Sequence, residues 1–206
     1  FVVLGFVGVW KLSEEIFKNK YYSLISVLLL ESIYFYNFTT PEFNVNVCQL
    51  PFWSFTVLYC WKCIEKNKTQ DWVLLGIFAG LGFLSKYLFV YLLISIKIFF
   101  LYKIYKENKF NPKYLIPGIV FLLIISPHLI WLVSNNFITI FYGLDRTSLD
   151  TIRLLSHVLN PLSFSFKQLG ILIPFILLLL TIVSKFRIKI NFKDKKKLFL
   201  FFITIF

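Results

Sequence analysis

Long apolar runs alternate with short basic segments along the whole chain. About 20 apolar residues cross a bilayer as one helix, and no run has the strict apolar–polar alternation of a membrane barrel strand. Hydrophobic residues make up 58% of the chain, and the pattern predicts an all-α, polytopic integral membrane protein. The apolar runs cover residues 1–10, 21–36, 43–62, 72–100, 114–134, 168–184 and 198 onward.

The run over residues 72–100 is longer than one membrane crossing requires, and Lys86 lies near its middle. A charged side chain inside the bilayer costs about 3 kcal/mol on insertion scales and usually faces a cavity or a site. The run is therefore either one long tilted helix or two short helices that turn at Ser85–Lys86. The first arm of such a hairpin carries three glycines that favour close helix packing, Gly76, Gly80 and Gly82.

The basic residues decide between these two interpretations. The net charge is +12, and the basic residues gather in clusters between apolar runs, as in cytoplasmic loops under the positive-inside rule. One long helix would place the third cluster outside, whereas a hairpin keeps 17 of the 22 basic residues inside. The hairpin is therefore predicted, with anionic membrane lipids, and not nucleic acid, as partners of the clusters. The clusters span residues 11–20, 62–68, 103–113 and 185–197.

With the hairpin, several polar residues collect at the outer membrane face. They come from the loop before the third apolar run, the Ser85–Lys86 turn and the predicted extracytoplasmic loop over residues 135–167. Cations and carboxylates that face each other at one membrane surface suit an anionic headgroup. The candidate substrate-binding residues are Glu42, Asn46, Lys86, Tyr87, His128 and Arg146.

The order of these motifs resembles a known family. Thr39-Thr40-Pro41 precedes Asn46 and an LPFW run, and Gly76-x-x-x-Gly80-Leu81-x-Phe83-Leu84-Ser85-Lys86-Tyr87 is the most specific piece. Pro127-His128 and Tyr142-Gly143-x-x-Arg146 follow. Together, over about residues 1–150, they resemble the glycosyltransferase family 39, or PMT-type, membrane enzymes of the GT-C fold, which include bacterial relatives of aminoarabinose transferase.

The resemblance implies one GT-C-like helical bundle over residues 1–206, truncated at both ends, with about eight transmembrane segments. It implies an inverting transfer of a sugar from a polyprenyl-phosphate donor to a lipid, glycan or protein acceptor. The reaction is expected at the extracytoplasmic face of a bacterial inner membrane. The catalytic aspartate is expected upstream of Phe1.

The resemblance also implies roles for individual residues. Lys86 and Arg146 would hold the lipid phosphate, whose charge grows as the bond to the sugar breaks. The family often has aspartate at the position of Asn46, so this chain lacks a carboxylate at that position, although Glu42 is close by. The resemblance implies no definite cofactor, and it allows a divalent metal ion in the complete enzyme. His157 has no partner at metal-ligand spacing, so no metal ligands are assigned in this segment.

Simpler interpretations stay open beside these roles. In these, Lys86 only extends to the headgroup region, and Asp145 and Arg146 form a solvated ion pair. Glu42 acts on the dipole of the next helix, and His128 is structural. An inactive relative, or a transporter or lipid flippase with Lys86 and Glu42 as pathway charges, are the alternative functions. The absence of a visible repeat, and polar residues at one face, favour the enzyme.

Overall fold

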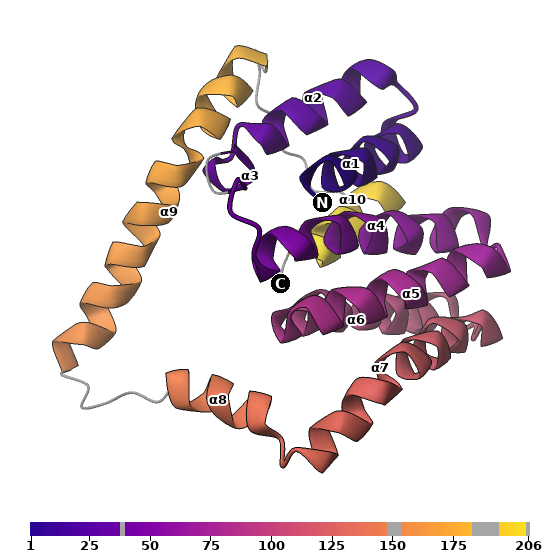
Figure 1. Cartoon of the computed structure of the whole chain (residues 1–206). Helices are drawn as coiled ribbons and strands as arrows, with labels where there is room; N and C mark the ends of the chain where they lie inside the picture. The colour runs from indigo at the N-terminus through magenta and orange to yellow at the C-terminus, as the bar shows by residue number, and fades with distance from the viewer. Residues whose placement is uncertain (38–39, 148–153, 183–193, 205–206) are drawn as a thin grey trace.

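The computed structural model describes residues 1–37, 40–147, 154–182 and 194–204, and helices account for the regular structure of these ranges (Figure 1). The predicted all-α class is therefore confirmed for the described residues. The elements are α1 (Val2–Phe17), α2 (Lys20–Glu31), α3 (Tyr34–Asn37), α4 (Val45–Lys66), α5 (Thr69–Ser85), the 3₁₀ helix η1 (Tyr87–Phe89), α6 (Val90–Glu107), the 3₁₀ helix η2 (Pro112–Leu115), α7 (Ile116–Ser134), α8 (Ile138–Thr147), α9 (Leu154–Ile182) and α10 (Lys195–Thr204).

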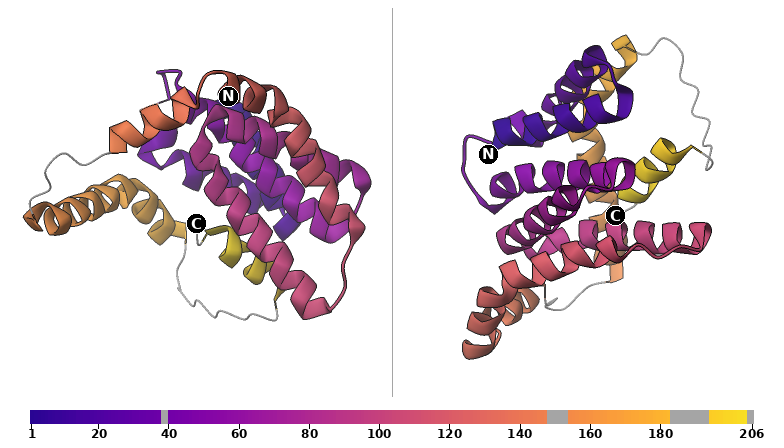
Figure 2. Two further views of the ribbon diagram at one scale, coloured as in Figure 1. Left: turned by 90° about the horizontal axis from the view of Figure 1, so that it is seen from below. Right: turned by 90° about the vertical axis from the view of Figure 1, so that its right-hand side faces the viewer.

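The helices form a stack in which α4 and α5 are central. The order α2, α1, α4, α5 and α7 follows from their mutual packing, and α10 lies against α6 (Figures 1 and 2). Helix α9 contacts α2 and α3 and otherwise extends away from the stack. The core lies between α4, α5, α6 and α10, where large aromatic side chains are almost fully buried. These side chains are Trp61, Trp72, Phe89, Phe99 and Phe199.

The predicted hairpin over residues 72–100 is confirmed. Helix α5 ends at Ser85, Lys86 is extended with φ −163° and ψ 128°, and α6 starts after the short η1. The arms run in opposite directions, because the Trp72 ring at the start of α5 lies 5.4 Å from the Phe100 ring in α6. Ser85 closes the last turn of α5 by donating its hydroxyl proton to the Gly82 carbonyl at 2.6 Å.

Glycines on α5 allow the close helix packing that the sequence predicted. A Cβ at Gly76 would lie 2.7 Å from Val120 Cβ and 2.8 Å from the carbonyl oxygen of Pro117. A Cβ at Gly80 would lie 2.8 Å from Ile124 Cγ2. These separations are shorter than van der Waals contact, so a side chain at either position would push α7 away from α5.

Three helical stretches within the described residues are long and apolar enough to cross a membrane: Tyr87–Glu107, Pro112–Ser134 and Leu159–Ile182. The prediction of about eight transmembrane segments is therefore not supported. Helices α1 and α2 have only 16 and 12 residues, and the expected span over 21–36 is divided between α2 and α3. Helix α5 is apolar but short.

Element boundaries differ from the hydropathy pattern in two places. Helix α1 continues past residue 10 to Phe17, because its polar residues find partners on neighbouring helices, as in the 3.0 Å hydrogen bond between the Ser13 and Ser26 hydroxyls. The expected loop over residues 135–167 contains α8 and the first part of α9. The side of the membrane on which this segment lies stays a prediction.

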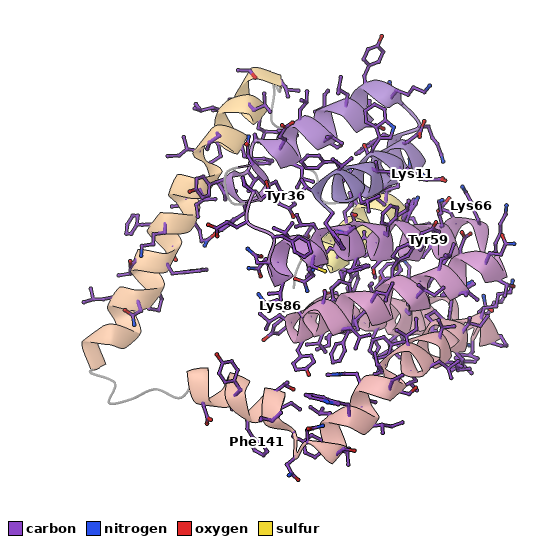
Figure 3. The ribbon with its side chains drawn as sticks, viewed as in Figure 1. Lys11, Tyr36, Tyr59, Lys66, Lys86 and Phe141 are labelled. Atoms are coloured by element: carbon purple, nitrogen blue, oxygen red, sulfur yellow. The ribbon has the colours of Figure 1, made fainter. Side chains whose placement is uncertain are left out.

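The basic clusters meet at one end of the stack. The Lys195 ammonium lies 2.7 Å from Glu65 Oε1, and Lys66 pairs with Glu15. Lys113 donates to the carbonyl oxygen of Asn67 at 2.7 Å. Residues from all four sequence clusters therefore share one end, and Figure 3 shows Lys66 at the opposite end of the stack from Lys86. The shared end agrees with the charge argument that predicted the hairpin.

Candidate functional site

Lys86 occupies the turn between α5 and η1, where it contacts the start of α4. Its ammonium donates a hydrogen bond of 2.6 Å to Asn46 Oδ1, across 40 residues of sequence. Asn46 is itself fixed, because its backbone N–H donates to the side chain of Asn44, the N-cap of α4, at 2.9 Å. The structure therefore brings together two predicted site residues, Lys86 and Asn46.

The hydrogen-bond partner of the Lys86 ammonium is a neutral group. The amide oxygen of Asn46 is a neutral acceptor, and among the described residues Lys86 forms no ion pair with a carboxylate. The side chain is partly exposed. A cation that is held in place by a neutral partner is able to attract an anion, since one hydrogen bond uses only one of its three donors.

Tyr87, the next residue, faces the other side of α5. Its hydroxyl lies 2.7 Å from His128 Nε2 in α7 and 2.9 Å from Thr139 Oγ1 in α8. A tyrosine hydroxyl donates one proton, so it accepts in at least one of these two hydrogen bonds. His128 also stacks on Trp131 at 5.8 Å between ring centroids. Tyr87 thus connects the hairpin turn to both α7 and α8.

The bend between α7 and α8 places Thr139 within hydrogen-bond distance of Tyr87. Asn136 and Phe137 have φ values of 51° and 56°, a left-handed conformation that is unfavourable for a bulky residue such as phenylalanine. Thr139 was not among the predicted site residues, because it lies in a segment expected to be a loop and 52 residues from its partner. No sequence signal connects it to Tyr87.

The two remaining predicted residues are Glu42 and Arg146, and Glu42 lies apart from these contacts. Glu42 is exposed in the segment before α4, and its backbone carbonyl accepts from Asn44 Nδ2 at 3.2 Å. Asn44 is the N-cap of α4, so Glu42 does not take that position. Arg146 lies in the last turn of α8, but its side chain is outside the described residues. The phosphate role of Arg146 and its pairing with Asp145 both stay predictions.

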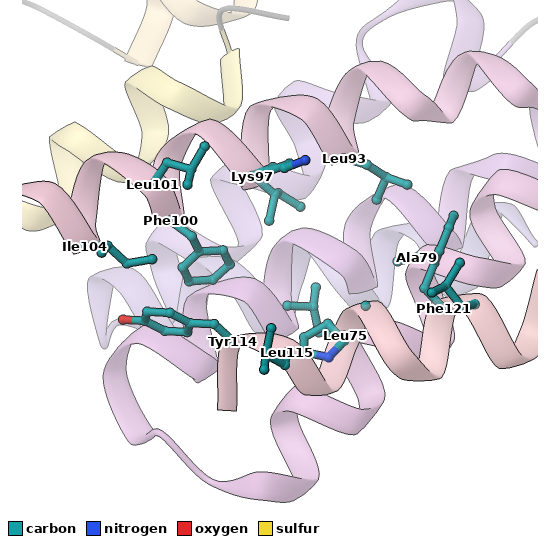
Figure 4. Close-up of a pocket in the computed structure, with 14 residues that line it drawn as sticks. Leu75, Ala79, Leu93, Lys97, Phe100, Leu101, Ile104, Tyr114, Leu115 and Phe121 are labelled. Carbon is teal, nitrogen blue, oxygen red and sulfur yellow. The ribbon is translucent and has the colours of Figure 1, made fainter. Parts of the chain in front are cut away.

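An apolar groove lies between α5, α6 and α7 (Figure 4). Its volume is about 540 Å³. One positively charged residue, Lys97 on α6, is among the residues that line the groove. Gly118 on α7 borders open space, since a Cβ at this position would meet nothing within 4 Å. Hydropathy alone cannot reveal this groove, because it depends on how far α6 and α7 diverge. Its apolar lining includes Leu75, Ala79, Leu93, Phe100, Phe121 and Leu122.

The described residues do not form a metal centre. No three of their histidine, cysteine, aspartate or glutamate side chains are grouped so that they could hold an ion. The divalent metal ion that the resemblance allows in the complete enzyme stays a prediction.

A comparison with protein families identifies the group to which these helices belong. The model of the dolichyl-phosphate-mannose-protein mannosyltransferase family matches residues 1–131. The chain belongs to this mannosyltransferase family. No curated protein and no solved structure matches the chain.

Membership makes this chain a membrane glycosyltransferase of the GT-C type, a family whose sugar donors are linked to polyprenyl phosphate. The mannosyltransferase match covers α1 to most of α7. It therefore includes Glu42, Asn46, Lys86, Tyr87 and His128. Thr139 and Arg146, both on α8, lie beyond the match.

The Tyr87 contacts give a first prediction. Tyr87→Phe removes the hydroxyl that connects His128 to Thr139, and each lost hydrogen bond is worth about 1 kcal/mol. We expect faster amide hydrogen exchange in α8, with little change in α4. Tyr91→Phe is the matched control, because Tyr91 is half exposed on α6 and forms no hydrogen bond with a described side chain. Unchanged exchange in α8 of the Tyr87 variant would show that the hydroxyl does not hold this helix.

Proposed function

We propose that this mannosyltransferase-family chain transfers a sugar from a polyprenyl-phosphate donor to an acceptor at the extracytoplasmic face, with Lys86 as the phosphate-binding residue. The observation that carries the proposal is the Lys86 ammonium held 2.6 Å from the neutral Asn46 amide. Lys86 lies at the end of the stack opposite to the basic clusters, which is the outer end under the positive-inside rule.

The proposed reaction places growing negative charge next to Lys86. The bond between the sugar anomeric carbon and the phosphate oxygen breaks, and its electron pair remains on the departing polyprenyl phosphate. The acceptor hydroxyl attacks the anomeric carbon from the opposite side and gives its proton to a carboxylate base. A fixed cation stabilises the charge on the leaving phosphate more strongly in the transition state than in the donor.

The base is not assigned to a described residue. The family resemblance implies an aspartate upstream of Phe1, so we propose that the base comes from that part of the complete protein. Glu42 is exposed near the start of α4 and stays a candidate for sugar or acceptor binding. His128 is hydrogen-bonded to Tyr87 and stacks on Trp131, so we propose that it positions Tyr87.

The substitution of asparagine for the common aspartate at position 46 has a physical consequence. An aspartate 2.6 Å from Lys86 would form an ion pair and cancel much of the charge that an anionic donor could use. Asn46 holds the ammonium in place without neutralising it. The uncompensated ammonium supports phosphate binding by Lys86.

We further propose that the groove between α6 and α7 holds part of the polyprenyl chain. Gly118→Trp would place a large side chain in its open space without a backbone clash. We expect the KM for a long-chain polyprenyl-phosphate donor to rise about tenfold. The tryptophan would displace part of the polyprenyl chain from the groove, and the lost apolar contacts are worth about 1 kcal/mol of binding free energy. The KM for a water-soluble short-chain donor should not change. Equal effects on both donors would contradict this location of the chain.

The experiment that tests the proposed function uses the complete protein, with any sequence that precedes Phe1. Purified protein in lipid vesicles is given a radiolabelled polyprenyl-phosphate sugar and a membrane extract as acceptor source. Label should move from the donor to an acceptor, with release of polyprenyl phosphate in equal amount. Release without an acceptor product, or no reaction at all, would oppose the proposal.

A transporter or lipid flippase remains the second candidate, and one observation favours it. Lys97 lies at the centre of the Tyr87–Glu107 membrane stretch and lines a groove, and charges at this depth often mark a transport pathway. Movement of the labelled lipid across the vesicle membrane without chemical transfer would support this function over the enzyme.

A further inference from the structure

A polar hollow lies at the end of the stack opposite to Lys86. It has a volume of about 550 Å³ and is formed by α1, the start of α2 and the second half of α4. Figure 3 shows two of its residues, Lys11 and Lys66, at this end. Five lysines outnumber two glutamates in its lining, which consists of Lys11, Glu14, Glu15, Lys18, Lys20, Lys62 and Lys66.

The charges of this hollow are only partly compensated within the chain. Glu15 accepts hydrogen bonds from Lys66 and, at 3.0 Å, from Lys18. Burial alone would raise the pKa of the Glu15 carboxyl, but the two ammonium groups lower it overall. Glu15 is therefore ionised, and its charge is paired with Lys18 and Lys66. Within the described ranges, the other three lysines, Lys11, Lys20 and Lys62, have no carboxylate partner.

Helix ends add to the positive potential of the hollow. Helix α2 begins at Lys20, so its positive end is directed there. The negative ends of the neighbouring helices are occupied by ammonium groups from α10. Lys196 donates to the carbonyl oxygen of Ile16 near the end of α1, and Lys195 donates to that of Ile64 near the end of α4, at 3.4 Å. Glu14 is the lining carboxylate without an ion pair among the described residues. Three lysines without a carboxylate partner outnumber it, and one of them, Lys62, lies over the Tyr59 ring at 5.0 Å.

The position of the hollow fits the headgroup level of a membrane. Tyr21 and Tyr22 at the start of α2 are 78% and 53% exposed, and exposed tyrosines are typical of the membrane–water interface. Lys11 lies about 10 Å before Lys18 along the axis of α1, at 1.5 Å per residue. The lysines therefore span the depth over which a lipid phosphate and its glycerol are found.

From this geometry we propose that the hollow binds the phosphate headgroup of an anionic phospholipid, with Lys11, Lys20 and Lys62 as its direct partners. This site is separate from the Lys86 turn and does not depend on the proposed transfer reaction. Its ligand would be a structural lipid of the inner leaflet. The apolar stems of the lysines and the exposed tyrosine rings would contact the upper part of its acyl chains.

The test measures lipid binding to the complete protein in neutral detergent. Phosphatidylglycerol is titrated while the thermal unfolding temperature is recorded, with phosphatidylcholine as the neutral reference. In the variant with Lys11, Lys20 and Lys62 all changed to glutamine, we expect the apparent affinity for phosphatidylglycerol to fall about tenfold or more. Each lysine near an anionic lipid adds to the electrostatic attraction between the protein and the lipid. In phosphatidylcholine the variant should unfold at the same temperature as the parent.

The control removes the same number of charges from the same end of the stack. Lys68, Lys106 and Lys109 lie outside the hollow, and their joint change to glutamine should leave the affinity within about threefold. Equal losses in the two triple variants would overturn the site and leave only diffuse attraction. Glycerol phosphate in solution should neither stabilise the protein nor displace the lipid; if it does either at similar concentration, the ligand is a free phosphate and the lipid assignment is wrong.

Discussion

Lys86→Ala is expected to lower kcat/KM for sugar transfer about 100-fold or more. The removal of one preorganised donor to a developing negative charge typically costs this amount. The side chain is partly exposed and contributes one hydrogen bond to Asn46, so its loss should change the unfolding temperature little. The measurement is the initial rate of label transfer from a polyprenyl-phosphate sugar, at several donor concentrations, with the parent and the variant side by side.

Two further variants separate charge from packing at this position. Lys86→Arg retains a cation and should recover part of the activity, although its planar group fits the Asn46 contact differently. Asn46→Asp should lower activity about tenfold while leaving the lysine in place, because the new carboxylate pairs with the ammonium. If the alanine variant transfers sugar like the parent, Lys86 only extends to the headgroup region, as the simpler interpretation held.

Gly76→Ala is expected to destabilise the protein by about 2 kcal/mol or more, an overpacking cost at a tight helix contact. The new methyl group would lie 2.8 Å from the Pro117 carbonyl oxygen and 3.0 Å from Pro117 Cα. These are backbone atoms that cannot rotate away, so α7 as a whole must move. The free energy of unfolding in mixed detergent micelles measures the effect.

The matched control is Gly118→Ala on α7, where an added methyl group meets nothing within 4 Å. Alanine is a better helix former than glycine by nearly 1 kcal/mol in a helix interior. The control should therefore be as stable as the parent or slightly more so. A similar loss of stability in both variants would show that helix α5 does not depend on its close approach to α7.

The hairpin illustrates what the sequence predicts well. The distribution of charge along the chain depends on which side of the membrane each segment occupies, so the basic clusters determined the turn at Ser85–Lys86. The glycines of α5 were predictable for a related reason, since small residues at helical spacing favour close contact. The family resemblance, which is confirmed over residues 1–131, rests on the same stretch.

The number and ends of the helices were less predictable, because polar residues can continue a helix when a neighbouring helix supplies partners. Helix α1 contains the buried Ser13 and the paired Glu15 beyond its apolar part. Helix α10 was expected from residue 198, yet it already begins at Lys195, and its Phe199 enters the core. These contacts come from tertiary packing and leave no local pattern.

The candidate site was only partly predictable for the same reason. Lys86 and Asn46 were each recognised from motifs, and the structure adds the hydrogen bond between them. Tyr87 and His128 were also predicted, but Thr139 completes their network from a helix that hydropathy did not indicate. The side chain of Arg146, the second expected phosphate ligand, is outside the described residues.

Direct binding of unglycosylated polyprenyl phosphate tests, without sugar transfer, whether Lys86 binds the phosphate of the lipid donor. The dissociation constant is measured for the complete parent protein, for Lys86→Ala and for Lys167→Ala, which removes the same charge from the exposed surface of α9. We expect an affinity about tenfold lower for the Lys86 variant, equivalent to about 1.4 kcal/mol, and no change for the Lys167 variant. Equal affinities of the parent and Lys86→Ala would contradict phosphate binding by Lys86.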